Sequence, residues 1–262
     1  MSNIAFLDTN VLKHIVTNSS HGQEIINLLN NKNIQIVTFK KCLYEIYSMI
    51  RMVAIKDLNN GRKNKDDPIN NLFLPKISKY SKILRKHKIE QKNVEYWFNL
   101  SQEWEGWEFF SRQEEHIEKY IKDNAEKILA KEDLELKKDF IKWKAVIREF
   151  YDLIDTFIEK NNIRVYNYSE VYSSEWYKDE GYLLEINISK NCMLPNEDFE
   201  IIIAAIFSKS KVFITNETKN NGIVMRGAIS SNISFPLCFC NSKKLEEAID
   251  SDFILRFYHE SN

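Results

Sequence analysis

The sequence predicts an α/β protein with a parallel sheet, interrupted by a long helical segment. Two short apolar segments, at residues 4–7 and 34–38, are each followed by a stretch with helical spacing of apolar residues. Two strand-to-helix units in succession are typical of a parallel sheet covered by helices. A third observation is the change of character over residues 56–160, where the chain is highly charged and carries few strand signals.

The first part of the chain contains two predicted strands. Alternation of Ile34, Ile36 and Thr38 between polar neighbours is a strand pattern. The elements expected before residue 56 are a strand at 4–7, a helical stretch after residue 10, a helix at about 23–30, a strand at 34–38 and a helix at about 40–58.

Residues 56–160 are predicted to form a helical insertion. One stripe of apolar side chains recurs there at spacings of three and four: Phe140, Trp143, Ile147, Phe150, Ile154 and Phe157. We expect this stripe to pack against a core rather than to stack on bases. Without the insertion, residues 1–55 and 161–262 make a core of about 157 residues, close to a common single-domain size. We therefore expect one discontinuous α/β domain.

The α/β pattern returns after the insertion. The elements expected there are a strand at 163–166, a helix at about 197–208, strands at 212–215 and 236–240, and a helix at about 243–249.

The composition favours carboxylates as the side chains that carry any catalytic chemistry. The four cysteines and five histidines are dispersed, so neither a zinc site nor a disulfide framework is indicated. The formal net charge is −1, so any nucleic-acid-binding surface must be local. The start MSNIAFLDTN has no secretory pattern, and no long apolar run is present. We expect a cytoplasmic protein without membrane contact.

Acidic residues follow the predicted strands or begin the predicted helices. Asp8 follows the first strand and Glu217 follows the strand at 212–215, while Glu45 and Asp198 lie near helix starts. Carboxyl ends of parallel strands share the edge where crevices form, so we expect the four acids to converge. Converging carboxylates repel one another unless cations lie between them, and oxygen ligands suit Mg²⁺ or Mn²⁺. Such ions can activate water for phosphodiester cleavage.

The same residues carry a resemblance to the PIN-domain family. The motifs that resemble the family's are IAFLDTNVL with Asp8 and Asn10, CLYEIYSMI with Glu45, EDFEIIIAAI with Asp198, VFITNETKN with Glu217, and the C-terminal run SFPLCFCNSKKLEEAI. The fourth position departs from the family, which more often has Asp there. Glu197, beside Asp198, is the alternative for the third acid.

This resemblance implies a PIN-like three-layer fold around a central parallel sheet. It also implies an endoribonuclease that hydrolyses RNA with Mg²⁺ or Mn²⁺ held by Asp8, Glu45, Asp198 and Glu217, acting as a toxin or in RNA processing. The resemblance further implies supporting polar residues around the acids, and we count Asn10, Thr215 and Asn216 as substrate-binding residues. A protein inhibitor such as an antitoxin and a homo-oligomeric state stay open.

Simpler interpretations exist for each acid. An Asp after a strand is often the N-cap of the next helix. Asp198 would also favour the dipole of its helix from the first turn, and Glu45 alone would be an ordinary solvated helix residue. Two rival functions therefore remain: a PIN-like scaffold without catalysis that binds RNA or protein, and a nuclease that acts on DNA.

The insertion contains a basic stretch that offers a second functional signal. Residues 56–92 contain 11 Lys or Arg against 4 Asp or Glu, whereas residues 93–118 contain 7 Glu and one Arg. Either the two stretches pair with each other, or the basic one binds RNA phosphates. Under the second interpretation we expect Lys82, Arg85 and Lys86 to contact the substrate.

Overall fold

The computed structural model describes residues 3–58, 66–86, 134–191, 196–216 and 238–250. The chain divides into two compact units, one formed by residues 1–43 and 157–262 and the other by residues 44–156. Helices α3 (Lys40–Leu58) and α7 (Leu134–Lys160) each run from one unit into the other. The boundaries between the two units, after residues 43 and 156, thus lie within these two helices.

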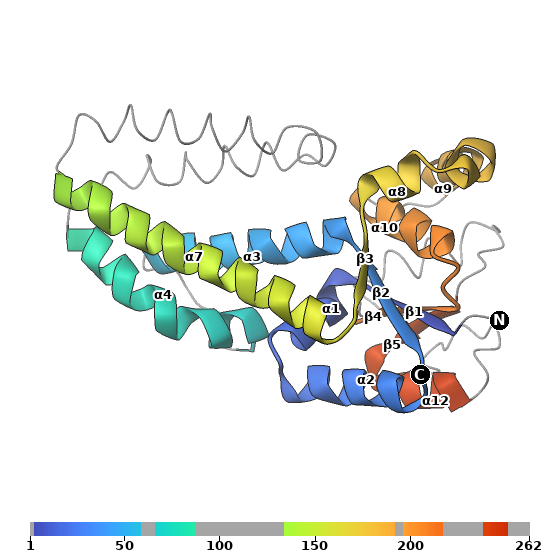
Figure 1. The fold of residues 1–262 in the computed structure, drawn as a ribbon, viewed down its shortest axis with the longest axis horizontal. Helices are drawn as coiled ribbons and strands as arrows, with labels where there is room; N and C mark the ends of the chain where they lie inside the picture. The colour runs from blue at the N-terminus through green and yellow to red at the C-terminus, as the bar shows by residue number, and fades with distance from the viewer. Residues whose placement is uncertain (1–2, 59–65, 87–133, 192–195, 217–237, 251–262) are drawn as a thin grey trace. The chain divides into compact units, whose positions relative to one another are not determined.

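The first unit contains a sheet of five parallel strands. These are β1 (Ile4–Leu7), β2 (Gln35–Phe39), β3 (Arg164–Tyr166), β4 (Val212–Thr215) and β5 (Cys238–Asn241). Their order across the sheet is β3-β2-β1-β4-β5, and every neighbouring pair is parallel (Figure 1). The predicted α/β class with a parallel sheet is therefore confirmed.

Aromatic packing aligns the central strands. Strand β1 is buried at all four positions, as expected of a parallel strand covered on both faces. Phe6 pairs in register with Phe213, which pairs with Phe239 on the next strand. The Phe6 and Phe213 rings stack with centroids 5.5 Å apart, and the Phe213 and Phe239 centroids are 5.3 Å apart. A register slip would break this ladder.

Helices cover both faces of the sheet. The first unit adds α1 (Thr9–Val16), α2 (Ser20–Asn31), α8 (Tyr168–Tyr172), the π-helix η1 (Tyr177–Gly181), α9 (Tyr182–Asn191), α10 (Asn196–Phe207), the 3₁₀-helix η2 (Ser242–Lys244) and α12 (Leu245–Asp250). Figure 1 shows α2 and α12 on one side of the sheet and α8 to α10 on the other. This arrangement is compatible with a three-layer α/β fold.

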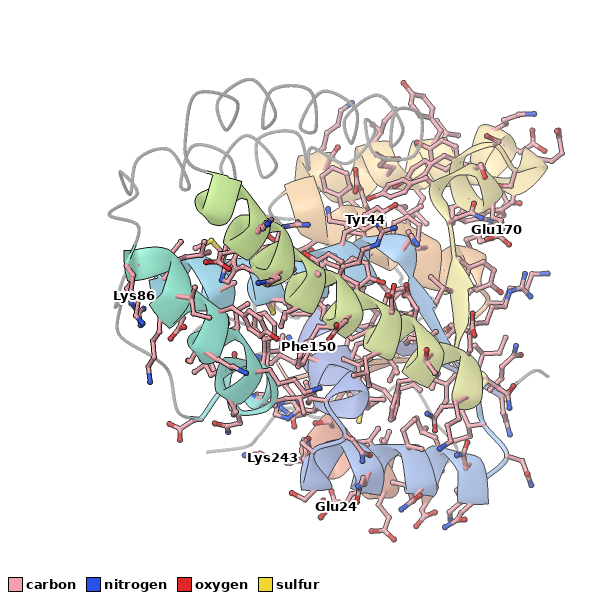
Figure 2. The ribbon with its side chains drawn as sticks, turned by 60° about the vertical axis from the view of Figure 1, so that its left-hand side comes forward. Glu24, Tyr44, Lys86, Phe150, Glu170 and Lys243 are labelled. Carbon is pink, nitrogen blue, oxygen red and sulfur yellow. The ribbon has the colours of Figure 1, made fainter. Side chains whose placement is uncertain are left out.

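The described part of the second unit consists of helices. It comprises α3 from Tyr44 onward, α4 (Pro68–Lys86) and α7 as far as Thr156. Trp143 is fully buried and donates a hydrogen bond from Nε1 to Ser81 Oγ over 3.2 Å. Phe150, labelled in Figure 2, meets Phe73 edge-on with ring centroids 4.5 Å apart. The predicted packing role of the aromatic stripe is thereby confirmed for these residues.

Two further features of the described residues concern the cysteines and membrane spanning. Cys42 and Cys240 are buried. None of the described helices combines the length and the apolar character needed to span a bilayer.

Candidate functional site

The strand order of the sheet creates a switch point between β1 and β4. From β1 the chain builds outward through β2 and β3, whereas β4 and β5 extend the sheet on the other side. In open α/β sheets, ligands bind beyond the carboxyl ends of the two strands that flank such a reversal. Asp8 directly follows β1, and Thr215 is the last residue of β4. The fold therefore places both residues at the position where a ligand is expected.

Asp8 is buried, and both of its carboxylate oxygens accept hydrogen bonds. Asp8 exposes only 8% of its surface to solvent. Thr9 donates its backbone N–H to Oδ1 over 2.7 Å, so Asp8 is the N-cap of α1. Thr215 Oγ1 donates to Oδ2 over 2.7 Å. The N-cap interpretation is thus correct, and the contact with Thr215 shows that the carboxylate also belongs to the strand-end cluster.

Burial and a neighbouring acid make the ionised form of Asp8 unfavourable. Burial raises the pKa of Asp8 from 3.8 to about 6, although hydrogen bonds from Thr215, Thr9 and Asn10 oppose the rise. The negative charge of Asp198 raises this pKa further. Asp198 lies half-buried in the first turn of α10. The structure therefore brings two of the four predicted acids close enough to repel each other.

Asn10 ties the ends of β1 and β4 together. Its Nδ2 donates to Thr215 Oγ1 over 3.1 Å, and its Oδ1 accepts the backbone N–H of Asn216 over 2.7 Å. The side chain is half-buried. The three predicted polar neighbours of the acids, Asn10, Thr215 and Asn216, thus form one hydrogen-bonded group with Asp8.

The other two predicted acids are not placed in this cluster. Glu45 is half-buried on α3, in the second unit. Glu217 lies outside the described residues, directly after Asn216 in the chain. Within the described ranges, no group of three or more His, Cys, Asp or Glu side chains is arranged to hold a metal ion. The four-carboxylate site therefore remains a prediction, and the structure shows only that Asp8 and Asp198 interact electrostatically.

The ion pair between Lys41 and Glu200, near the same edge of the sheet, was not predicted from the sequence. Lys41, two residues beyond β2, is fully buried, and its Nζ lies 3.0 Å from Glu200 Oε2 on α10. Tyr168 OH donates to the same oxygen over 3.4 Å. Burial raises the pKa of Glu200, and the Lys41 ammonium opposes that rise. Full burial and the contact with Glu200 distinguish Lys41 from an ordinary surface lysine, and sequence spacing reveals neither.

The basic stretch of α4 divides into two kinds of residue. Four lysines, at spacings of three and four, are exposed along one face of the helix, and we call them the lysine stripe: Lys76, Lys79, Lys82 and Lys86 (Figure 2 labels Lys86). The ion pairs found among the described residues involve none of them. Arg85 is only half-exposed, and its Nη1 donates to the backbone carbonyls of Asp57 and Leu58 near the end of α3.

Comparison with known proteins adds no identification: the chain matches no family model, no curated protein and no solved structure.

Proposed function

We propose that this chain is a Mg²⁺- or Mn²⁺-dependent ribonuclease whose cation site lies at the carboxyl ends of β1 and β4. The observation that carries the proposal is the pair formed by buried Asp8 and neighbouring Asp198 at the switch point of a parallel sheet. Two hard oxygen ligands that repel each other suit a divalent cation, because the cation removes the repulsion. The residues present thus fit the ion.

Each residue of the site has a defined part in this proposal. Asp8 and Asp198 would hold the cation, and Glu217 is the further ligand that we propose from the sequence. Thr215 and the N–H of Thr9 hold the carboxylate of Asp8 in one orientation through their two hydrogen bonds. A bound divalent cation supplies a water of lowered pKa for attack on the phosphodiester.

Two features favour a nucleic-acid substrate, and the first of them favours RNA. The resemblance of the four acidic motifs to PIN-domain proteins implies RNA cleavage. The lysine stripe offers four exposed positive charges to a phosphate backbone. DNA cleavage and binding without catalysis are the rival outcomes of the test below.

Cleavage of single-stranded RNA and of DNA with the same sequence tests the proposal. The reactions contain Mg²⁺, Mn²⁺ or a chelator, and the variants are Asp8→Asn and Asp198→Asn. Asp152→Asn is a matched control, because Asp152 lies exposed on α7 in the second unit. We expect cation-dependent RNA cleavage by the wild type and by the control, and none by the two site variants.

Three results would contradict parts of this proposal. Cleavage that persists in the chelator would exclude the cation, and cleavage of DNA in preference to RNA would change the substrate. Tight RNA binding without cleavage under all conditions would favour the non-catalytic scaffold.

A further inference from the structure

The hydrogen bonds at the strand ends continue beyond Asn216 to a histidine on another helix. Ser242 Oγ, at the start of η2, donates to Asn216 Oδ1. His21 Nε2, on α2, lies 2.9 Å from the same Ser242 Oγ. Because Asn216 also donates its N–H to Asn10, the chain of contacts runs from α2 through η2 and the end of β4 toward the first strand.

Hydrogen counting fixes the direction of these bonds. A serine hydroxyl has one hydrogen, and Ser242 uses it on Asn216, so Ser242 can only accept from His21. With Asn216 Oδ1 assigned as the acceptor from Ser242, the His21 tautomer that fits this contact carries its hydrogen on Nε2. From His21 onward each donor then points toward Asp8: Ser242 to Asn216, Asn216 to Asn10, Asn10 to Thr215, and Thr215 to Asp8. The Asn10 amide and the Thr215 hydroxyl each accept one bond and donate the next, so these aligned bonds strengthen the contact with Asp8. Asn216 joins them to Ser242 mechanically, because its side-chain oxygen accepts from Ser242 while its backbone N–H donates to Asn10.

The directions of these hydrogen bonds argue against Ser242 as a nucleophile with His21 as its base. A serine nucleophile donates its hydrogen to the histidine, whereas Ser242 donates to Asn216. Ser242 is also only 6% exposed. The His21–Ser242 contact therefore orients neighbouring groups and does not activate the hydroxyl.

His21 is held in place by its surroundings. Ser19 is the N-cap of α2 and accepts the N–H of Gly22. A Cβ on Gly22 would lie 2.1 Å from the His14 carbonyl oxygen, so only glycine permits α2 to approach α1 this closely. The His14 ring packs edge-on against His21 with centroids 5.3 Å apart. The imidazole is consequently presented to Ser242 by a close-packed helix junction.

We propose that His21 is a positioning residue for the cation site: through Ser242 and Asn216 it holds the end of β4 and orients the carboxylate of Asp8. This inference rests on the proposed function, since it assigns a role toward the same cation. Outer hydrogen-bonding partners of a metal ligand fix its orientation, and their loss typically reduces metal affinity or activity by about 10- to 100-fold.

Two isosteric variants of His21 separate positioning from simple packing. In His21→Gln, the amide nitrogen replaces Nε2 and retains the donor to Ser242. In His21→Asn, the amide nitrogen replaces Nδ1 instead, and the donor is lost. Ser242→Ala removes the next link. Mn²⁺ affinity, measured by electron paramagnetic resonance on the full chain, is the first readout, and kcat and KM for RNA are the second.

A buried serine elsewhere in the same unit provides the control. Ser210, which lies before β4 at the opposite end of the strand, shares a 2.6 Å hydrogen bond with Ser208. Ser210→Ala thus removes a buried hydrogen bond without touching the network. We expect His21→Asn and Ser242→Ala to bind Mn²⁺ about 10-fold more weakly and to lose kcat with little change in KM. His21→Gln and Ser210→Ala should behave like the wild type.

The possible failures are distinguishable. Wild-type Mn²⁺ affinity in both His21→Asn and Ser242→Ala would overturn the positioning role while leaving the proposed cation site intact. Equal losses in His21→Gln and His21→Asn would also overturn it, because packing would then explain both. Absence of Mn²⁺ binding by the wild type would overturn the proposed function and this inference together.

Discussion

Asp8→Asn should stabilise the protein when no cation is present. In the folded chain the pKa of Asp8 is raised by burial and by Asp198, from 3.8 to about 6. One pKa unit corresponds to about 1.4 kcal/mol, so ionised Asp8 costs the folded protein about 3 kcal/mol at pH 7. Asparagine has the same shape and carries no charge. It can accept the N–H of Thr9 and donate to Thr215 Oγ1, so its hydrogen bonding is not lost.

The pH dependence follows from the direction of this pKa change. Because the folded-state pKa is raised, the folded protein binds more protons than the unfolded chain between pH 3.8 and about 6. The stability contributed by protonated Asp8 is present below this window and is lost as the pH rises through it. The advantage of Asp8→Asn should therefore reach about 3 kcal/mol at pH 7 and shrink toward zero near pH 4.

Urea unfolding in a chelating buffer measures this effect. The wild type, Asp8→Asn and the exposed control Asp152→Asn are compared at several pH values between about 4.5 and 7. We expect a gain in the free energy of unfolding for Asp8→Asn alone, growing with pH. A loss of stability at pH 7, or a gain independent of pH, would refute the view that Asp8 is held in an unfavourable charged state.

Four further predictions concern the cation site, the Lys41–Glu200 pair, the lysine stripe and Arg85. Mn²⁺ at 100 times its Kd should stabilise the wild type by about 2.7 kcal/mol and so raise its melting temperature. This rise should disappear in Asp198→Asn. An equal rise in the wild type and in Asp198→Asn would contradict the proposed cation site. Glu200→Gln removes the carboxylate that lies 3.0 Å from the buried Lys41 ammonium, so urea unfolding should show a loss of about 3 kcal/mol. A loss near zero would show that the pair contributes nothing to stability. Replacing Lys82 and Lys86 of the lysine stripe with alanines should flatten the salt dependence of RNA binding by up to about 1.4 log-log units without changing stability. Arg85→Ala should instead reduce stability by about 1–3 kcal/mol and leave the salt slope unchanged, and the reverse pattern would exchange the two roles.

Strand and helix positions in the first unit were predictable because local periodicity and burial agree there. All five strands were expected from apolar runs, and the structure places them in one parallel sheet. Residues 168–191 were not predicted. That segment contains the π-helix η1, whose wider turn shifts the helical spacing of apolar residues and removes the pattern by which a helix is recognised.

The site was predictable where it depends on strand ends and not where it depends on side chains from distant elements. Asp8 and Thr215 follow from strand boundaries, because parallel strands end at one edge. The contacts between His21 and Ser242, 221 positions apart, and between Lys41 and Glu200, 159 positions apart, follow only from packing of helices against the sheet. Arg85 appeared equivalent to its lysine neighbours, although its guanidinium contacts backbone carbonyls of α3.

Calorimetric titration of the full chain with Mn²⁺ tests the cation site most directly. The wild type and Asp152→Asn should bind Mn²⁺ with the same affinity. Asp8→Asn and Asp198→Asn should each bind at least about 100-fold more weakly, since loss of a direct ligand exceeds loss of an outer partner. Unchanged Mn²⁺ affinity in both site variants would contradict a cation held between these two carboxylates.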